Sequence, residues 1–112
     1  MAGSDLYTGT LDVVILKALS GQAMHGYAIG LWIRRHSREV LEVKEGVLYP
    51  ALHRVQRRGW VESRWGETDT GRRAKFYALT AQGRARLESE AARLAEYSEA
   101  VLSILNHDPA PG

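Results

Sequence analysis

The sequence contains no cysteine. A chain without thiols has no disulfide framework, no thiolate metal site and no cysteine nucleophile. It also contains no run of about 18 apolar residues, so it predicts no membrane-spanning helix. The first ten residues, MAGSDLYTGT, have neither a basic start nor an apolar stretch and therefore do not resemble a secretory signal. We expect a cytoplasmic protein.

Sequence motifs of the common enzyme classes are also missing. There is no G-x-S-x-G, no phosphate-binding P-loop and no G-x-G-x-x-G. The chain has four histidines, but His25, His36 and His107 share no metal-ligand spacing and no H-E-x-x-H occurs. We therefore expect no catalytic residue, no metal site and no cofactor, and we do not expect an enzyme.

Charged residues are present but unevenly distributed. The net charge of the whole chain is +2, which by itself indicates little. Residues 46–79 hold seven basic and three acidic side chains, whereas residues 80–112 hold three basic and five acidic ones. This contrast predicts one basic surface suited to a polyanion and a mildly acidic C-terminal segment.

Apolar residues recur at helical spacing in the first third of the chain. The pattern predicts a helix over residues 10–19, with Thr8 or Thr10 as its N-cap. It predicts a second helix over residues 24–37, followed by a linker with a short strand at residues 41–43. The expected inward-facing residues of the second helix are Tyr27, Ile29, Trp32 and Ile33.

The segment EGVLYPALHRVQRRGW combines a helical pattern with an internal proline. Leu48, Leu52 and Val55 recur on one side and are predicted to face the core. Proline lacks the N–H group that later helical positions need, so Pro50 is least costly within the first turn. This predicts a helix whose N-cap lies at or after Val47.

The opposite side of this third helix is polar and carries large side chains. Its residues, at helical spacing, are Tyr49, His53, Gln56 and Arg57, with Arg54 at the edge. Hydroxyl, imidazole, amide and guanidinium groups are suited to base edges and to phosphates. The pattern therefore indicates a helix that inserts into a DNA groove.

Two alternating, aromatic-rich runs follow, over residues 60–65 and 74–80. They are separated by GETDTGRR, which is rich in turn residues, so the pattern predicts a β-hairpin with a loose, charged tip. Thr80 is then expected to cap a long helix over residues 81–107.

The last predicted helix carries a near-heptad apolar stripe. Its members are Leu87, Ala91, Leu94, Val101 and Leu105, interrupted by Ser98, with Tyr97 beside it. A helix of about 25 residues cannot bury this stripe on a domain of about 80 residues. A second copy of the chain is the simplest cover, so we expect a homodimer.

Together these elements predict a mostly helical α+β fold: a winged helix-turn-helix of three helices and a β-hairpin wing, with a C-terminal dimerisation helix. The expected organisation is a DNA-binding domain over residues 1–80, a dimerisation helix over 81–107 and a disordered tail over 108–112. The basic third helix and wing favour nucleic acid over the alternative, a winged-helix module that binds another protein.

The string GVLYPALHRVQRRGWVESRW, preceded by HGYAI and followed by GRRAKFYALTAQG, closely resembles the PadR family of bacterial transcriptional regulators. The resemblance covers residues 9 to about 85 and extends to the last helix by position, as in the short-tailed branch. It implies a DNA-binding winged helix and a homodimer built largely through the C-terminal helix. Carried over by position, the family's DNA contacts include Tyr49, His53 and Arg57 and, in the wing, Arg72, Arg73 and Lys75.

Two positions depart from the family pattern. Members usually have serine or threonine where this chain has Val47, which removes a helix cap worth about 0.5–2 kcal/mol and any phosphate bond made by the hydroxyl. In drug-sensing members an aromatic residue of the last helix stacks around a flat ligand at the dimer interface, and Leu94 occupies that place here. We expect no response to planar cationic drugs by that mode. We expect instead that the protein senses a different small molecule at the dimer interface or is controlled by its own abundance.

We therefore expect a sequence-specific transcriptional regulator, and more narrowly a repressor, that binds a pseudo-palindromic operator in double-stranded DNA as a homodimer. Its predicted DNA contacts are Tyr49, His53, Arg54, Gln56, Arg57, Arg72, Arg73 and Lys75. Its predicted dimer contacts are Leu87, Ala91, Leu94, Tyr97, Val101 and Leu105.

Overall fold

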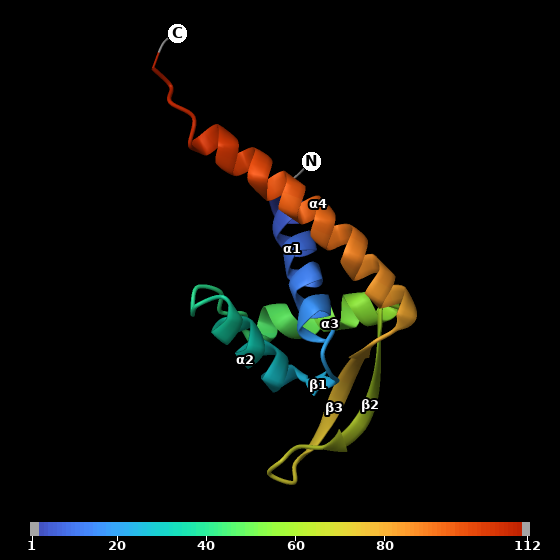
Figure 1. The fold of residues 1–112 in the computed structure, drawn as a ribbon. Helices are drawn as coiled ribbons and strands as arrows, with labels where there is room; N and C mark the ends of the chain where they lie inside the picture. Colours follow the sequence, from blue (N-terminus) through green and yellow to red (C-terminus); the bar gives the residue numbers. More distant parts are fainter. Residues whose placement is uncertain (1–2, 111–112) are drawn as a thin grey trace.

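The computed structural model describes residues 3–110. Within this range, four helices and a three-stranded antiparallel sheet of order β1-β3-β2 make up the fold (Figure 1). In chain order the elements are α1 (Gly3–Ala18), β1 (Met24–His25), α2 (Gly26–His36), α3 (Glu45–Arg57), β2 (Val61–Glu67), β3 (Arg73–Leu79) and α4 (Ala81–Leu105). The predicted winged helix-turn-helix is confirmed, with β2 and β3 as the wing and α4 as the C-terminal helix. Among the described residues, no helix has the length and apolar character needed to cross a bilayer.

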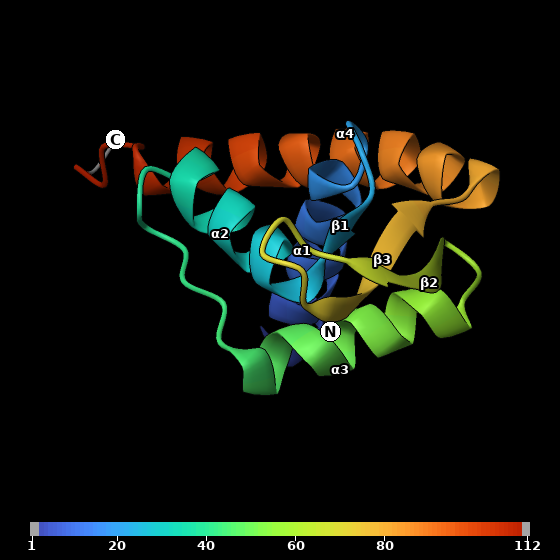
Figure 2. The same cartoon turned by 90° about the horizontal axis from the view of Figure 1, so that it is seen from below.

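Helix α1 lies at the centre of the fold, with α4 on one side and α2 and α3 on the other (Figures 1 and 2). Its Ile15 and Leu16 are fully buried. The core residues that α2 and α3 contribute around them are Ile29, Ile33, Leu48, Ala51, Leu52 and Val55. The predicted core face of the third helix is thereby confirmed, and each buried leucine, isoleucine or valine stabilises the fold by about 1.5–3 kcal/mol.

Two helix starts near the N-terminus differ from the expectation. α1 begins at Gly3, several residues before the predicted start, so both threonines proposed as its N-cap lie within the helix. α2 begins at Gly26 because Met24 and His25 form β1, which pairs with β3. Two residues carry too short a pattern for a strand to be predicted from sequence.

The inward face of α2 is mostly as predicted. Ile29 and Ile33 are buried, and Trp32 packs against the core. The prediction for Tyr27 is wrong, because its side chain is 73% exposed on the first turn of the helix. The short strand expected at residues 41–43 does not form, and this stretch of the linker has irregular backbone.

Pro50 lies deeper in α3 than the sequence indicated. The helix starts at Glu45 with Lys44 as its N-cap, so the expected N-cap at or after Val47 is wrong. The proline ring removes the hydrogen bond that an N–H at this position would donate to the carbonyl of Gly46. Gly46 and Pro50 are both exposed, so water can hydrate the carbonyl and the cost of the missing bond is reduced.

Thr80 joins the wing to α4. Its hydroxyl donates to the carbonyl of Gly59 at 2.7 Å and accepts from the N–H of Gly83 at 2.9 Å, so it is the N-cap that the sequence predicted. Its own N–H donates to the carbonyl of Trp60 at 3.1 Å. These bonds fix the direction in which α4 leaves the sheet.

The apolar stripe of α4 passes from the core into solvent along the helix. Leu87 is 9% exposed and belongs to the core of its own chain, which corrects its assignment to the dimer interface. Leu94 and Val101 are half-buried, Ala91 is exposed, and Leu105 is 71% exposed. Figure 1 shows the reason: the C-terminal half of α4 extends past the rest of the domain.

Candidate nucleic-acid interface

The outer face of α3 carries the polar residues that the sequence placed there. Tyr49 is 43% exposed, His53 and Arg57 are exposed, and Gln56 is half-buried. The opposite face is fixed in the core by residues such as Leu52, which is fully buried. The helix therefore presents a hydroxyl, an imidazole, an amide and a guanidinium toward solvent in a set orientation.

Arg54 differs from its neighbours on α3 because Asp12 of α1 holds it. Its Nη2 lies 2.6 Å from Oδ1 of Asp12, and its Nε lies 3.2 Å from Oδ2. Asp12 is 5% exposed, and Nη1 of Arg58 lies 3.6 Å from the same Oδ2. The hydrogen bonds to Asp12 raise the pKa of Arg54 above its usual value, although burial opposes them. This sets Arg54 apart from the other predicted DNA contacts of α3: its guanidinium is paired with Asp12 and ties α3 to α1.

Replacing Arg54 with methionine is expected to lower the free energy of unfolding by about 2 kcal/mol. Breaking a buried ion pair costs about 3–5 kcal/mol, but solvent screens the partly exposed arginine and Arg58 can move closer to Asp12. Arg57→Met, which removes an exposed arginine from the same turn, should change stability by less than about 0.5 kcal/mol. Urea unfolding of both variants checks this, and equal stabilities would contradict the structural role of Arg54.

A hydrogen-bonded turn forms the tip of the wing. The backbone N–H of Thr68 donates to the carbonyl of Arg72 at 2.8 Å, and its carbonyl accepts from the N–H of Gly71 at 2.9 Å. The Thr68 hydroxyl accepts from the N–H of Arg72 at 3.1 Å. Gly71 has a φ of 82°, which a residue without a Cβ adopts at little cost. The tip predicted to be loose is thus ordered, and it sets the positions of Arg72 and Arg73.

The basic residues of the wing are exposed. The guanidinium of Arg73 lies over the ring of Trp65, 4.8 Å from the centroid, and Lys75 is the cross-strand neighbour of Trp65. Trp65 is 59% exposed, and a cation–π stacking is worth about 0.5–1 kcal/mol at an exposed site. The stacking limits the motion of Arg73 and leaves its charge at the surface.

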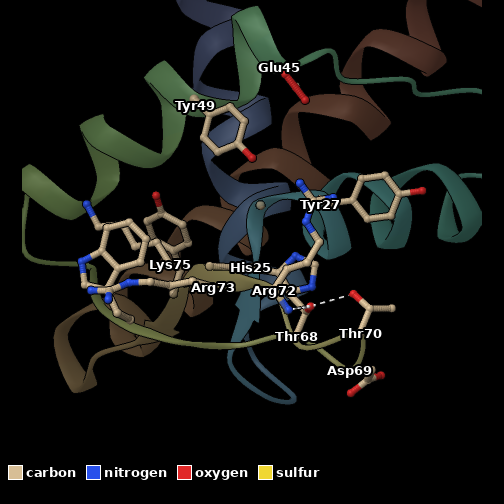
Figure 3. Close-up of a pocket in the computed structure, with 14 residues that line it drawn as sticks. His25, Tyr27, Glu45, Tyr49, Thr68, Asp69, Thr70, Arg72, Arg73 and Lys75 are labelled. Carbon is tan, nitrogen blue, oxygen red and sulfur yellow. Dashed lines mark hydrogen bonds between the residues drawn. The ribbon is translucent and has the colours of Figure 1, made fainter.

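A groove of about 810 Å³ lies between the start of α3 and the wing (Figure 3). Tyr49 reaches into it from α3, and Arg72, Arg73 and Lys75 border it from the wing. Its other labelled lining residues are His25, Tyr27, Glu45, Thr68, Asp69 and Thr70. The groove thus brings together four of the predicted DNA contacts, whereas His53, Gln56 and Arg57 lie further along α3.

His25 and Tyr27 also line the groove, although neither was predicted as a site residue. Nδ1 of His25 accepts from the backbone N–H of Ala28 at 3.3 Å and caps α2, which leaves Nε2 as the protonated nitrogen. Its ring meets Phe76 edge to face at 5.3 Å. The HGY tripeptide was visible in the sequence, but only the pairing of β1 with β3 places the His25 ring beside Phe76 of the wing.

Tyr77 of β3 also lines the groove and is almost fully buried, at 6% exposure. Burial raises the pKa of its phenol, and the neighbouring Tyr49 adds to the effect. The Tyr77 phenol therefore stays neutral under ordinary conditions and contributes no charge to the groove.

No metal centre is formed by the described part of the chain: it contains no group of three or more histidine, cysteine, aspartate or glutamate side chains that could hold an ion. The groove also contains the carboxylates of Glu45 and Asp69. These are accompanied by three cationic side chains of the wing, so cations outnumber anions along its border.

Comparison with known proteins agrees with this geometry. The sequence model of the transcriptional regulator PadR-like family matches residues 15–89. The chain is 34% identical to the transcriptional regulator Rv3488 of Mycobacterium tuberculosis, over 74% of this chain and 78% of that protein. A transcriptional regulator from Clostridium thermocellum has a similar structure, with a TM-score of 0.79 and 27% identity over 92% of this chain and 99% of that one. For a PadR-like transcriptional regulator from Bacillus cereus the TM-score is 0.77 and the identity 26%, over 93% and 99% of the two chains.

Fold and similarity together define a winged-helix transcriptional regulator, a class of proteins that are not enzymes. Since the family model covers more than half of the chain, the protein belongs to the PadR-like family of transcriptional regulators. The resemblance inferred from the sequence motifs is thereby confirmed.

Proposed function

We propose that the protein is a sequence-specific DNA-binding repressor that binds a pseudo-palindromic operator as a homodimer in the bacterial cytoplasm. The observation that carries this proposal is the placement of α3 and the wing. Tyr49, at the start of the polar face of α3, borders the same groove as Arg72, Arg73 and Lys75 of the wing, and all four side chains are exposed. A recognition helix beside a cationic wing is the arrangement that fits a major groove and its flanking phosphates.

The two surfaces have different tasks in this proposal. Tyr49, His53 and Arg57 of α3 reach base edges in the major groove, with Gln56 at the margin of the contact. Arg72, Arg73 and Lys75 bind phosphates and add affinity that does not depend on sequence. Arg54 is not included, because it is paired with Asp12.

Removing two wing charges is expected to weaken binding to every duplex. Arg72→Ala/Arg73→Ala should reduce affinity for random-sequence DNA about tenfold or more at low salt, and should lower the salt slope by about two counterions. Arg84→Ala/Arg93→Ala removes the same charge from exposed positions of α4 and should leave both quantities nearly unchanged. Gel shifts at several salt concentrations measure the difference. A wing variant that binds like the wild type would refute the role of the wing.

The homodimer is proposed from the exposed end of α4. Leu102, Ile104 and Leu105 are 55–73% exposed, although such residues are normally covered. A two-fold contact between α4 helices would bury them and would place two α3 helices for consecutive half-sites. Ala91, Leu94, Tyr97 and Val101 lie along the same helix and remain proposed dimer contacts.

An effector at the dimer interface also remains a proposal. Leu94 is half-buried, and Tyr97, at 41% exposure, lies on a neighbouring part of the helix surface. The position opposite the dimer mate thus lacks the aromatic ring that would sandwich a planar drug.

Selection of bound fragments from the source genome by the purified protein tests the central proposal, which is sequence-specific binding to DNA. Enrichment of no sequence would instead favour a winged-helix module that binds protein.

A further inference from the structure

Gly26 is a buried residue at the first position of α2, directly beneath the ring of Tyr49. A Cβ built on Gly26 would lie 2.6 Å from the phenolic oxygen of Tyr49, 2.7 Å from its Cε1 and 2.8 Å from its Cζ. These separations are far below a van der Waals contact. The outer edge of the Tyr49 ring therefore occupies the space that any side chain at position 26 would need.

The backbone gives no other reason for glycine at this position. The glycines with positive φ in the described part of the chain are Gly59 and Gly71, so Gly26 has a conformation open to every residue type. Glycine also carries a cost in conformational entropy within a helix. The feature that position 26 requires is the absence of a Cβ, because the ring lies there.

Tyr49 is thus held on one side by the surface of α2 while the rest of its ring faces the groove. It remains 43% exposed, and Figure 3 shows it reaching from α3 toward the groove, above His25 and Arg72. Tyr77 of β3 lines the same groove. A tyrosine has two side-chain torsions, so a ring seated against α2 presents its hydroxyl at one place relative to the wing.

We propose that Gly26 is a positioning residue: by leaving room for the Tyr49 ring, it sets where Tyr49 contacts DNA and so contributes to operator specificity. This inference rests on the proposed function. Gly26 itself touches no base or phosphate in the proposal, and its effect passes entirely through Tyr49.

Gly26→Ala should displace the ring without unfolding the chain. The atoms that obstruct the new Cβ are the far end of one flexible side chain and not backbone, and that side chain has open groove beside it. Alanine is also a better helix former than glycine. The melting temperature of Gly26→Ala is therefore expected to equal or exceed that of the wild type. Gly30→Ala is the matched control, because it adds a Cβ to the same helix at 3.7 Å or more from its neighbours.

Binding is measured with two probes, a duplex that the wild type selects from a random pool and an unselected duplex of the same length. Gly26→Ala should lower the ratio of the two affinities about tenfold, as the loss of one good base contact does, with less than about a twofold change on the unselected duplex. Gly30→Ala should leave the ratio unchanged. In a Tyr49→Ala background, Gly26→Ala should have no further effect, since the residue it displaces is already gone.

A DNA-free readout accompanies these measurements. Nitration of Tyr49 by tetranitromethane, followed by mass spectrometry, should be several-fold faster in Gly26→Ala than in the wild type or Gly30→Ala. Unchanged nitration, or an equal loss of specificity from Gly26→Ala with and without Tyr49, would overturn the positioning role. A wild type that selects no duplex would instead refute the proposed function, while faster nitration would still show that Gly26 seats the ring.

Discussion

Replacing Gly83 with alanine is expected to lower the free energy of unfolding by about 3 kcal/mol or more, a large part of the total stability of a domain this size. A Cβ on Gly83 would overlap the carbonyl oxygen of Trp60 and lie 2.7 Å from its carbonyl carbon. Both obstructing atoms belong to the backbone, so no side-chain rotation can relieve the overlap.

The backbone at Trp60 cannot easily move away from α4, because two hydrogen bonds tie this stretch to Thr80, the N-cap of that helix. Its carbonyl accepts from the N–H of Thr80 at 3.1 Å, and the adjacent carbonyl of Gly59 accepts from the Thr80 hydroxyl at 2.7 Å. Shifting α4 to admit the alanine would also lengthen the capping bond from Gly83 to Thr80. Loss of an N-cap bond costs about 1 kcal/mol in addition to the strain.

Urea unfolding followed by circular dichroism measures this effect. Gly46→Ala is the control, because Gly46 also lies in the first turn of a helix but a Cβ there meets nothing within 4 Å. The free energy of unfolding of Gly46→Ala should equal that of the wild type or exceed it by up to about 1 kcal/mol. Similar stabilities for the two variants would show that α4 leaves the wing differently from the arrangement described.

Replacing Leu105 with glutamate is expected to dissociate the proposed homodimer. Leu105 is 71% exposed in the single chain, so the substitution should leave the stability of the monomer nearly unchanged. In a two-fold contact between α4 helices it would place a charge in an apolar seam on each copy. We expect a cost of about 3 kcal/mol, which raises the dissociation constant roughly 100-fold.

Ser103→Glu is the matched control, since Ser103 is exposed in the same turn of α4 but lies on the opposite side of the helix from Leu105. It adds the same charge without entering the seam and should remain a dimer. Sedimentation equilibrium distinguishes the two variants. A wild-type monomer at micromolar concentration would remove the two-fold operator from the proposal, and a dimeric Leu105→Glu would place the interface elsewhere.

The helices and the hairpin were predictable from the sequence because their signals are local. Leu48, Leu52 and Val55 form one side of a helix by spacing alone, and all three are buried. Thr80 has the side chain and the position of an N-cap, and it makes the expected bond to Gly83. Backbone geometry and the periodicity of burial determine such features within a few residues.

Boundaries were predicted less well where the helix start depends on its surroundings. Pro50 favoured a helix whose N-cap lies at or after Val47, but α3 begins at Glu45 because the exposed carbonyl of Gly46 can do without its helical partner. β1 has no sequence signal of its own. It exists because β3, some fifty residues later, offers an open edge.

The sequence by itself determined the winged-helix class, the polar face of α3 and the basic wing, because each follows from the spacing or charge of neighbouring residues. Tertiary structure alone decided which of these residues are free. Arg54 and Arg57 look alike in sequence. Of the two, Arg54 lies at hydrogen-bond distance from Asp12 of α1 and Arg57 does not. The contact between the Tyr49 ring of α3 and Gly26 of α2 likewise joins two helices. Such contacts form when distant segments pack in three dimensions, and no local pattern of spacing records them.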